Sequence, residues 1–213
     1  APVISITAPS AGAYITNTTP PIEFTVTDAD SGVASIAVTL DGTAISSITK
    51  TAVTGGYKCT CKPASALKDG SHTISITATD NDGNTSAAKT STFMVDTVPP
   101  TLSITAPAEG LVTNKTTVTV TGKTDDATSK PVTVTVNGAA ATVGTDGSFS
   151  KDVSLSNGAN KITIIATDKA GKTTTVVRNV TLDTAAPVIK SISITPNPVD
   201  CGKTFIISVE ITD

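Results

Sequence analysis

The sequence predicts an all-β protein made of two complete β-sandwiches in tandem and the first two strands of a third. Apolar and polar residues alternate in segment after segment, with turn residues between, as is typical of strands that bury one face. The opening segment APVISITAP (1–9) returns as PPTLSITAP (99–107) and as APVIKSISITP (186–196). Successive copies start about 90 residues apart, which is the size of one small domain.

The repeat predicts three domains. Residues 1–98 and 99–185 form the complete copies, and residues 186–213 form the partial one. The connections 96–100 and 183–187 are short and contain proline, so they are stiffer than Gly/Ser linkers. We therefore expect consecutive modules to line up as an elongated rod.

Composition supports sheets rather than helices. The chain has no Trp, and aromatic residues make up 3% of it, so the core must rest on Val and Ile. Their branched side chains are stiff and pack well on a pleated surface. No segment has a sustained helical period, and PASALKDG (63–70) is interpreted as a turn that crosses between sheets. Helix content should be close to nil.

About seven strands are expected in each module, which indicates a Greek-key sandwich. In the first module they lie near 2–7, 21–27, 33–40, 43–49, 56–62, 72–79 and 89–95. Parity assigns these side chains to its core: Ile4, Ile6, Ile22, Phe24, Val26, Ile36, Val38, Leu40, Ile74, Ile76, Ala78, Phe93 and Val95. The corresponding set in the second module is Leu102, Ile104, Val118, Val120, Val132, Val134, Val136, Ile162, Ile164, Ala166, Val180 and Leu182.

Two dipeptides predict tight hairpins that set the register of adjacent strands. Asp41-Gly42 and Asn137-Gly138 each sit between alternating runs. A two-residue hairpin turn requires positive φ at both central positions, which Asp, Asn and Gly tolerate best.

Several functional classes are excluded by composition. The net charge is −3 and no cluster of Lys or Arg occurs, so nucleic acid is not an expected partner. No apolar stretch approaches the roughly 18 residues that a membrane span requires. The first residue is Ala, so we expect the chain to be a processed or excerpted piece of a longer protein. No catalytic motif accompanies the single His72, and we expect no enzyme activity.

Three groups of residues carry a family resemblance. TDADSGVASIAVTLDG (27–42), PASALKDGSHTISITATDNDGNTS (63–86) and the linker sequences DTVPP and DTAAP resemble the bacterial immunoglobulin-like repeats of large surface adhesins. The resemblance implies extracellular, cell-surface modules that act as non-catalytic structural or adhesive stalks. Neighbouring Ig-like modules would be their direct partners, and host-surface or glycan partners are compatible with it.

Acidic residues are expected to gather at the junctions between modules. In a sandwich of this topology, the loops carrying Asp125, Asp126 and Asp168 lie at the end where the linker carrying Asp96 arrives. Ca²⁺ prefers six to eight hard oxygen ligands, so this junction is a candidate calcium site, and no other cofactor is expected. The resemblance points to Ca²⁺ as well.

Equivalent acidic positions occur at the other two junctions. The matching end of the first module offers Asp28, Asp30, Asp80 and Asp82, and the second junction offers Asp183 and Asp213. The alternative is that these residues only make Asx-turns, in which Asp and Asn accept backbone N–H groups.

Three cysteines leave their state open. Cys59 and Cys61 project from the same face of one strand, which suits two buried, inert thiols. A disulfide between Cys201 and either Cys59 or Cys61, within the chain or with a neighbouring chain, is the alternative.

Two further functions remain as alternatives to a stalk. Residues 186–213 contain two alternating strands, 189–194 and 205–211, whose partners are missing, so the chain could be a self-assembling surface-layer or filament subunit in which they complement a neighbour. An accessory module of a secreted carbohydrate-active enzyme is the other. That function would need exposed aromatic residues, and only Tyr14 and Tyr57 are candidates.

Overall fold

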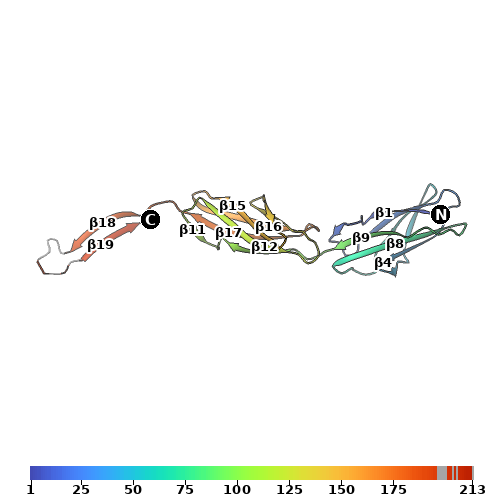
Figure 1. The fold of residues 1–213 in the computed structure, drawn as a ribbon, viewed down its shortest axis with the longest axis horizontal. Helices are drawn as coiled ribbons and strands as arrows, with labels where there is room; N and C mark the ends of the chain where they lie inside the picture. The colour runs from blue at the N-terminus through green and yellow to red at the C-terminus, as the bar shows by residue number, and fades with distance from the viewer. Residues whose placement is uncertain (196–200, 203, 205, 213) are drawn as a thin grey trace.

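The computed structural model describes residues 1–195, 201, 202, 204 and 206–212, and every regular element in that part is a β-strand. Three groups of strands follow one another along an elongated molecule (Figure 1). We call β1–β9 the first module, β10–β17 the second module, and β18–β19 the terminal hairpin. The all-β class and the rod-like tandem expected from the repeat are confirmed. No helix in the described part is long and apolar enough to cross a membrane.

Two sheets face each other in the first module. One has the order β1-β3-β7-β6 and the other β2-β9-β8-β4-β5. The strands are β1 (Val3–Ala8), β2 (Tyr14–Ile15), β3 (Ile22–Thr27), β4 (Val33–Leu40), β5 (Thr43–Ala44), β6 (Thr49–Val53), β7 (Gly56–Cys61), β8 (Gly70–Asp80) and β9 (Lys89–Val95). Alternation predicts the inward faces correctly: Phe24, Ile74, Ile76 and Phe93 are 0% exposed, while Ile6 and Ile36 are partly buried against the same core.

The second module repeats this arrangement, but its two sheets are joined. Its strands are β10 (Thr101–Ala106), β11 (Leu111–Thr113), β12 (Thr117–Asp125), β13 (Thr133–Val136), β14 (Ala139–Val143), β15 (Ser148–Ser154), β16 (Gly158–Thr167) and β17 (Thr173–Leu182). Because β14 pairs with β13 on one side and β15 on the other, the order is β10-β12-β15-β14-β13-β16-β17-β11. Its core also follows the predicted parity, with Leu102 and Ile104 only partly buried.

The expected strand at 43–49 is wrong in one respect. In the first module β5 pairs with β4, and β6 pairs with β7 in the opposite sheet, so the chain changes sheets between them. A cleft of about 610 Å³ opens at this crossing, with Leu40, Ile45 and Cys61 among its lining residues. The short strands β2 and β11, which pair in parallel with β9 and β17, were not predicted because two or three residues show no periodicity.

The predicted hairpin turns are confirmed. φ is 50° at Asp41 and 79° at Gly42, and 48° at Asn137 and 81° at Gly138. The segment between β7 and β8 crosses from one sheet to the other without forming a helix, as expected.

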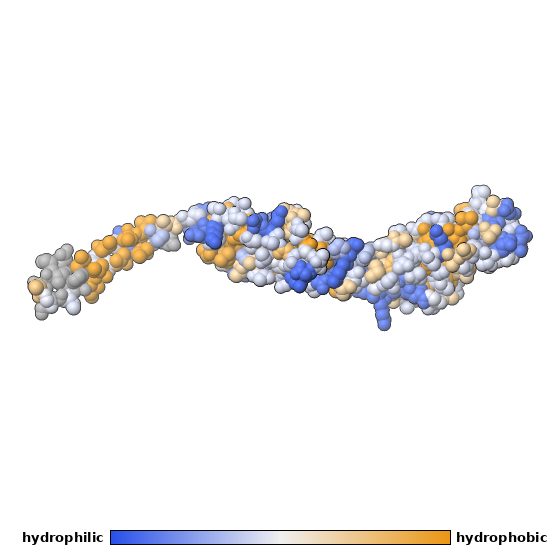
Figure 2. All heavy atoms as spheres, viewed as in Figure 1, coloured by the Kyte–Doolittle hydropathy of each residue, from blue (hydrophilic) through white to orange (hydrophobic). Residues whose placement is uncertain are grey.

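The terminal hairpin pairs β18 (Val188–Thr195) with β19 (Ile206–Thr212) in antiparallel fashion. Its apolar side chains are uncovered in the described structure and form the continuous orange surface in Figure 2. Ile192 is 63% exposed and Ile206 is 68% exposed. Phe205, where the second of these strands was expected to begin, lies outside the described residues.

Candidate functional site

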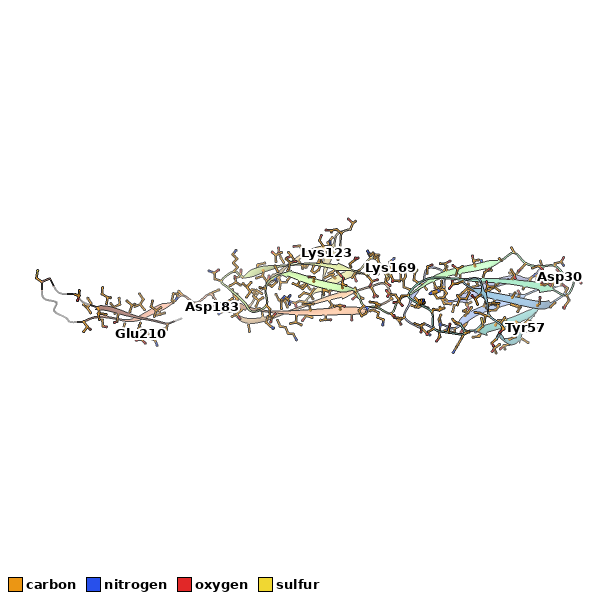
Figure 3. The ribbon with its side chains drawn as sticks, turned by 90° about the horizontal axis from the view of Figure 1, so that it is seen from below. Asp30, Tyr57, Lys123, Lys169, Asp183 and Glu210 are labelled. Atoms are coloured by element: carbon orange, nitrogen blue, oxygen red, sulfur yellow. The ribbon has the colours of Figure 1, made fainter. Side chains whose placement is uncertain are left out.

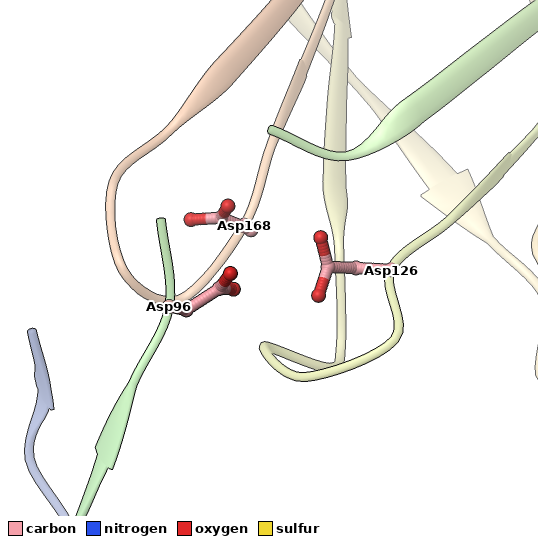
Figure 4. A group of neighbouring side chains, drawn as sticks. All are labelled: Asp96, Asp126 and Asp168. Carbon is pink, nitrogen blue, oxygen red and sulfur yellow. The ribbon is translucent and has the colours of Figure 1, made fainter. Parts of the chain in front are cut away.

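Three carboxylates meet where the first module leads into the second. Asp96 follows β9 and belongs to the linker, whereas Asp126 follows β12 and Asp168 follows β16. One oxygen from each residue lies within 4.8 Å of one oxygen from each of the others. The three side chains point into a common space, as Figure 4 shows. We call Asp96, Asp126 and Asp168 the junction cluster.

Local turns position each member of the cluster. The Oδ1 atom of Asp126 accepts N–H bonds from Thr128 at 2.8 Å and Ser129 at 2.6 Å. The Oδ1 atom of Asp168 accepts one from Lys172 at 2.8 Å. The bond from Thr128 is an Asx-turn bond, whereas those from Ser129 and Lys172 reach three and four residues along the same loops. The second module therefore holds two of the three carboxylates before any ligand arrives.

The linker holds the third carboxylate. The N–H of Asp96 donates to the carbonyl of Ile15, and Oδ1 of Asp96 accepts from the N–H of Val98 at 3.1 Å. Ile15 is on β2, so the short strand that the sequence did not reveal anchors the start of the linker.

Turn chemistry leaves part of the cluster unexplained. Asp96, Asp126 and Asp168 are 0%, 6% and 6% exposed. The Oδ2 atoms of Asp96 and Asp168 and the buried hydroxyl of Ser129 have no hydrogen-bond partner. Among the described residues, no basic side chain or amino terminus lies within 4.0 Å of any of these three carboxylates. Burying like charges without a counter-ion is costly, so the cluster fits a cation.

The donor set indicates which cation fits. Every candidate donor of the cluster is a carboxylate oxygen, and the cluster contains no sulfur or imidazole. Hard oxygen donors suit Ca²⁺ and Mg²⁺ rather than Zn²⁺. Irregular loops suit Ca²⁺ better, because it accepts flexible geometry whereas Mg²⁺ demands near-ideal octahedral geometry.

Asp125, the fourth predicted ligand, does not join the cluster. It is the last residue of β12 and has the outward parity of that strand, so its side chain is 66% exposed. Its carboxylate lies 2.8 Å from Nζ of Lys130, and this bond holds the pKa of Asp125 below its ordinary value. Ser129, which sequence reasoning missed, is buried in the next loop and donates its backbone N–H to Asp126.

The equivalent pair in the first module lies beside the first residue of the chain. The α-amino group of Ala1 lies 3.4 Å from Oδ2 of Asp28 and 3.3 Å from Oδ2 of Asp80. Asp28 and Asp80 make the same turn bonds as Asp126 and Asp168, to Ser31 and Asn84 respectively. The Oδ2 atoms of Asp28 and Asp80 therefore converge on one position. Of the other predicted ligands, Asp30 and Asp82 are exposed and only donate backbone N–H groups to this pair.

The second junction repeats the geometry of the linker. The N–H of Asp183 donates to the carbonyl of Thr113, and its Oδ1 accepts from the N–H of Ala185. Asp183 therefore corresponds to Asp96, and it lies at the end of the second module beside the hairpin (Figure 3). Asp213 lies outside the described residues.

Two polar contacts further restrain the first junction. Nζ of Lys169, at the end of the second module that faces the first (Figure 3), lies 5.0 Å from the ring centre of Tyr14. Asp69 accepts both the N–H and the hydroxyl of Thr97 at 3.0 Å. The first contact crosses between modules, and the second ties the linker to the first module.

The three cysteines are free in the structure, and a disulfide of Cys201 with Cys59 or Cys61 stays a prediction. Cys59 and Cys61 face the core of the first module at 0% and 4% exposure, whereas Cys201 is exposed beyond β18. Burial raises the pKa of Cys59, and it raises the pKa of Cys61 to about 11. Both thiols are therefore protonated at neutral pH and unreactive.

The two tyrosines offer little free aromatic surface. Both are half-buried, and each ring has a lysine ammonium over it: Lys169 over Tyr14, and Lys50 over Tyr57 at 5.6 Å. Stacking of a sugar ring would have to displace these lysines.

Comparisons with known proteins cover both modules. Residues 4–97 match a family model described as a bacterial Ig-like domain, and residues 100–184 match domain B of glucodextranase. Bacillopeptidase F of Bacillus subtilis (strain 168) is 39% identical over 126 residues. That alignment spans 59% of this chain but 9% of the relative's length.

Solved structures support the fold. Fibronectin(III)-like modules of CbhA from Clostridium thermocellum give a TM-score of 0.51 at 20% identity, covering 85% of this chain and 94% of that one. A titin fragment of three Ig domains gives a TM-score of 0.54 at 11% identity, covering 100% of this chain and 76% of that one. The chain therefore has the fold of a tandem of immunoglobulin-like modules.

Proposed function

We propose that this chain is a non-catalytic spacer of an extracellular bacterial protein, and that the junction between its first and second modules binds Ca²⁺. The observation that carries the proposal is the junction cluster, with two unpartnered carboxylate oxygens and no basic neighbour among the described residues. A bound Ca²⁺ supplies the positive charge that this cluster lacks.

The members of the cluster have unequal roles. Asp126 and Asp168 are held by backbone N–H groups of the second module, so they form the prearranged half of the site. Asp96 comes from the linker and completes the site from the other side. Ligation of all three carboxylates by one ion therefore fixes the linker to the second module and stiffens the rod.

The reactive side chains support a non-catalytic role. His72 has both ring nitrogens engaged, by Asp41 and by the carbonyl of Lys68. Cys59 and Cys61 are buried with raised pKa values. A nucleophilic thiol needs an adjacent base or a lowered pKa, and the pKa of both of these thiols is raised instead.

Isothermal titration calorimetry tests the calcium proposal. The wild-type chain should bind Ca²⁺, and Asp126→Asn should weaken binding at least tenfold because it removes a buried charged ligand. Asp125→Asn is the matched control: it removes the neighbouring carboxylate, which faces solvent and Lys130, and should leave this affinity unchanged. No heat from the wild type, or equal losses in both variants, would overturn the proposal.

A second candidate is an accessory spacer of a secreted hydrolase. The similarity to part of Bacillopeptidase F and the match to domain B of glucodextranase favour it, because both names belong to enzymes. The covered faces of Tyr14 and Tyr57 support a spacer rather than a sugar-binding module. Binding to soluble glucans or to a glycan array would instead favour recognition of carbohydrate.

A third candidate, self-assembly, rests on the terminal hairpin. Two strands alone are marginally stable in water, and the apolar side chains of β18 and β19 are exposed. Their cover would come from a neighbouring chain or from whatever follows in the same protein. Light scattering on the chain with and without residues 186–213 distinguishes these, because only assembly predicts a larger particle that the deletion abolishes.

A further inference from the structure

The one histidine of the chain lies where the first module meets the linker. His72 is on β8 and pairs with Phe93 of β9, three residues before Asp96. Its Nδ1 atom is 2.7 Å from Oδ2 of Asp41, and its Nε2 atom is 2.8 Å from the carbonyl oxygen of Lys68. The ring centre is 5.7 Å from that of Phe93, and the side chain is 11% exposed. The imidazole therefore bridges the turn after β4 and the segment that precedes β8.

Both groups that face the ring nitrogens are hydrogen-bond acceptors. A neutral imidazole has one N–H, so one of its nitrogens would face an acceptor with a lone pair. The protonated ring donates from both nitrogens and satisfies the Asp41 carboxylate and the Lys68 carbonyl together. We infer that His72 is a proton-dependent clamp that, when charged, holds the segment around Lys68 against the Asp41 turn and so steadies the linker to the second module.

The bonded path from this clamp to the linker is short. Lys68, whose carbonyl the ring holds, precedes Asp69, and Asp69 accepts the N–H and the hydroxyl of Thr97. Thr97 follows Asp96 of the junction cluster. Loss of the His72 bond therefore frees the segment that carries Asp69.

The charged groups around the ring favour its protonated form. Asp41 faces the ring from the turn after β4, and it also accepts a hydrogen bond from the N–H of Thr73. From β9 the ring is faced by the uncharged Phe93. The segment before β8 carries the charged residues Lys68 and Asp69, and the carboxylate of Asp69 is bonded to Thr97. Burial alone would lower the pKa of His72, but the bonds to Asp41 and to the Lys68 carbonyl outweigh it, so the pKa is raised. Burial acts to raise the pKa of Asp41, but the hydrogen bonds from His72 and Thr73 have the larger effect. The pKa of Asp41 is therefore lowered, and its carboxylate stays ionised.

The sign of the linkage follows from these directions. A raised pKa in the folded state means that the clamp stabilises fully below the ordinary value of 6.5. Its contribution is lost as the pH rises through the folded pKa. The junction should therefore be firmer in mildly acidic than in alkaline surroundings.

The second module provides an internal comparison. Its segment NGANKITIIATD (157–168) aligns with DGSHTISITATD (69–80), which places Asn160 where the first module has His72. The side-chain amide of Asn160 forms hydrogen bonds with the backbone of Ser156 and Gly158. Neither an amide side chain nor a backbone group titrates near neutral pH. The clamp therefore belongs to the first module, and His72→Asn is its matched, non-titrating replacement.

A pH titration followed by NMR tests the clamp. The full chain is titrated from about pH 5.5 to 8 in the presence of a chelator, so the result does not depend on calcium binding. We expect the single imidazole to titrate above 6.5 and the Thr97 amide to shift with the same midpoint. In His72→Asn the Thr97 shift should vanish. A midpoint at or below 6.5, a Thr97 amide that stays still in the wild type, or an equal shift in His72→Asn would overturn the inference.

Discussion

Carboxylate oxygens of Asp96 and Asp168 lie within 4.8 Å of one another, although one residue belongs to the linker and the other to a loop of the second module. Each keeps a buried oxygen without a hydrogen-bond partner. The linker and the loop after β16 therefore meet at this point, although the fold of each module alone does not require them to be close. The proposal that Ca²⁺ fixes the linker to the second module, and so stiffens the rod, follows from this approach of Asp96 to Asp168.

Gly56 is required by backbone packing between β3 and β7. A Cβ at this position would overlap the carbonyl oxygen of Val26 and lie 2.8 Å from Cα of Thr27, and neither backbone atom can rotate away. We expect Gly56→Ala to destabilise the first module by about 1–3 kcal/mol, as overpacking does. Gly144→Ala is the control, because its closest neighbour, at 3.0 Å, is the side chain of Asp146. Urea unfolding measures both, and equal stabilities would contradict the packing argument.

Only one of the three thiols should react quickly in the folded chain. Cys201 is exposed, whereas Cys59 and Cys61 lie in the core with raised pKa values. Colorimetric thiol titration should therefore find one rapid equivalent per chain, and the remaining two should appear on unfolding. Cys201→Ser should abolish the rapid phase. Rapid reaction of two or more thiols in the native protein would show that β7 is not packed as described.

Asp80 should make the first module sensitive to acid. The Nδ2–H of Asn84 is the main cause of its lowered pKa, with further bonds from backbone N–H groups and the Ala1 amine. Because the folded pKa is below the ordinary 3.8, this stabilisation is present above that pH and is lost as the pH falls through the folded pKa.

Comparison of two variants at neutral pH and near pH 3 checks this expectation. Asp80→Asn should lower the unfolding free energy at neutral pH, and the difference from wild type should shrink in acid. Asp82→Asn, which changes an exposed carboxylate in the same loop, should have little effect at either pH. A deficit that is the same at both pH values would mean that packing rather than charge explains it.

The two complete modules should be stable without the terminal hairpin. The cores end at Val95 and Leu182, and neither includes a residue of β18 or β19. Deletion of residues 186–213 should therefore leave the melting temperatures of both modules unchanged in calorimetry. A fall in either melting temperature would indicate that the hairpin packs against a module.

The fold could be predicted from sequence because its determinants are local. Alternation assigned Phe24, Ile76 and Val134 to the core, and Asp41-Gly42 to a turn, without knowledge of any partner strand. The failures concern partner choice. β5 and β6 differ in the sheet they join, and nothing local in 43–53 encodes that choice.

The candidate site could be predicted only in part. Aligning the repeats located Asp96, Asp126 and Asp168 at one junction, because equivalent loops of a sandwich share an end. The strand parity of Asp125 would have excluded it, had β12 been known to continue to that residue. The bond from the Ser129 N–H to Asp126 carried no signal, since it depends on how the loop closes.

Residual dipolar couplings test the central claim most directly, because they report the orientation of the first module relative to the second. With Ca²⁺ present, we expect both modules of the wild type to share one alignment tensor, because one ion ties Asp96 to Asp126 and Asp168. Chelation, or Asp126→Asn in the presence of Ca²⁺, should make the two tensors diverge, whereas Asp125→Asn should behave as wild type. Tensors that stay identical on removal of calcium would contradict the account.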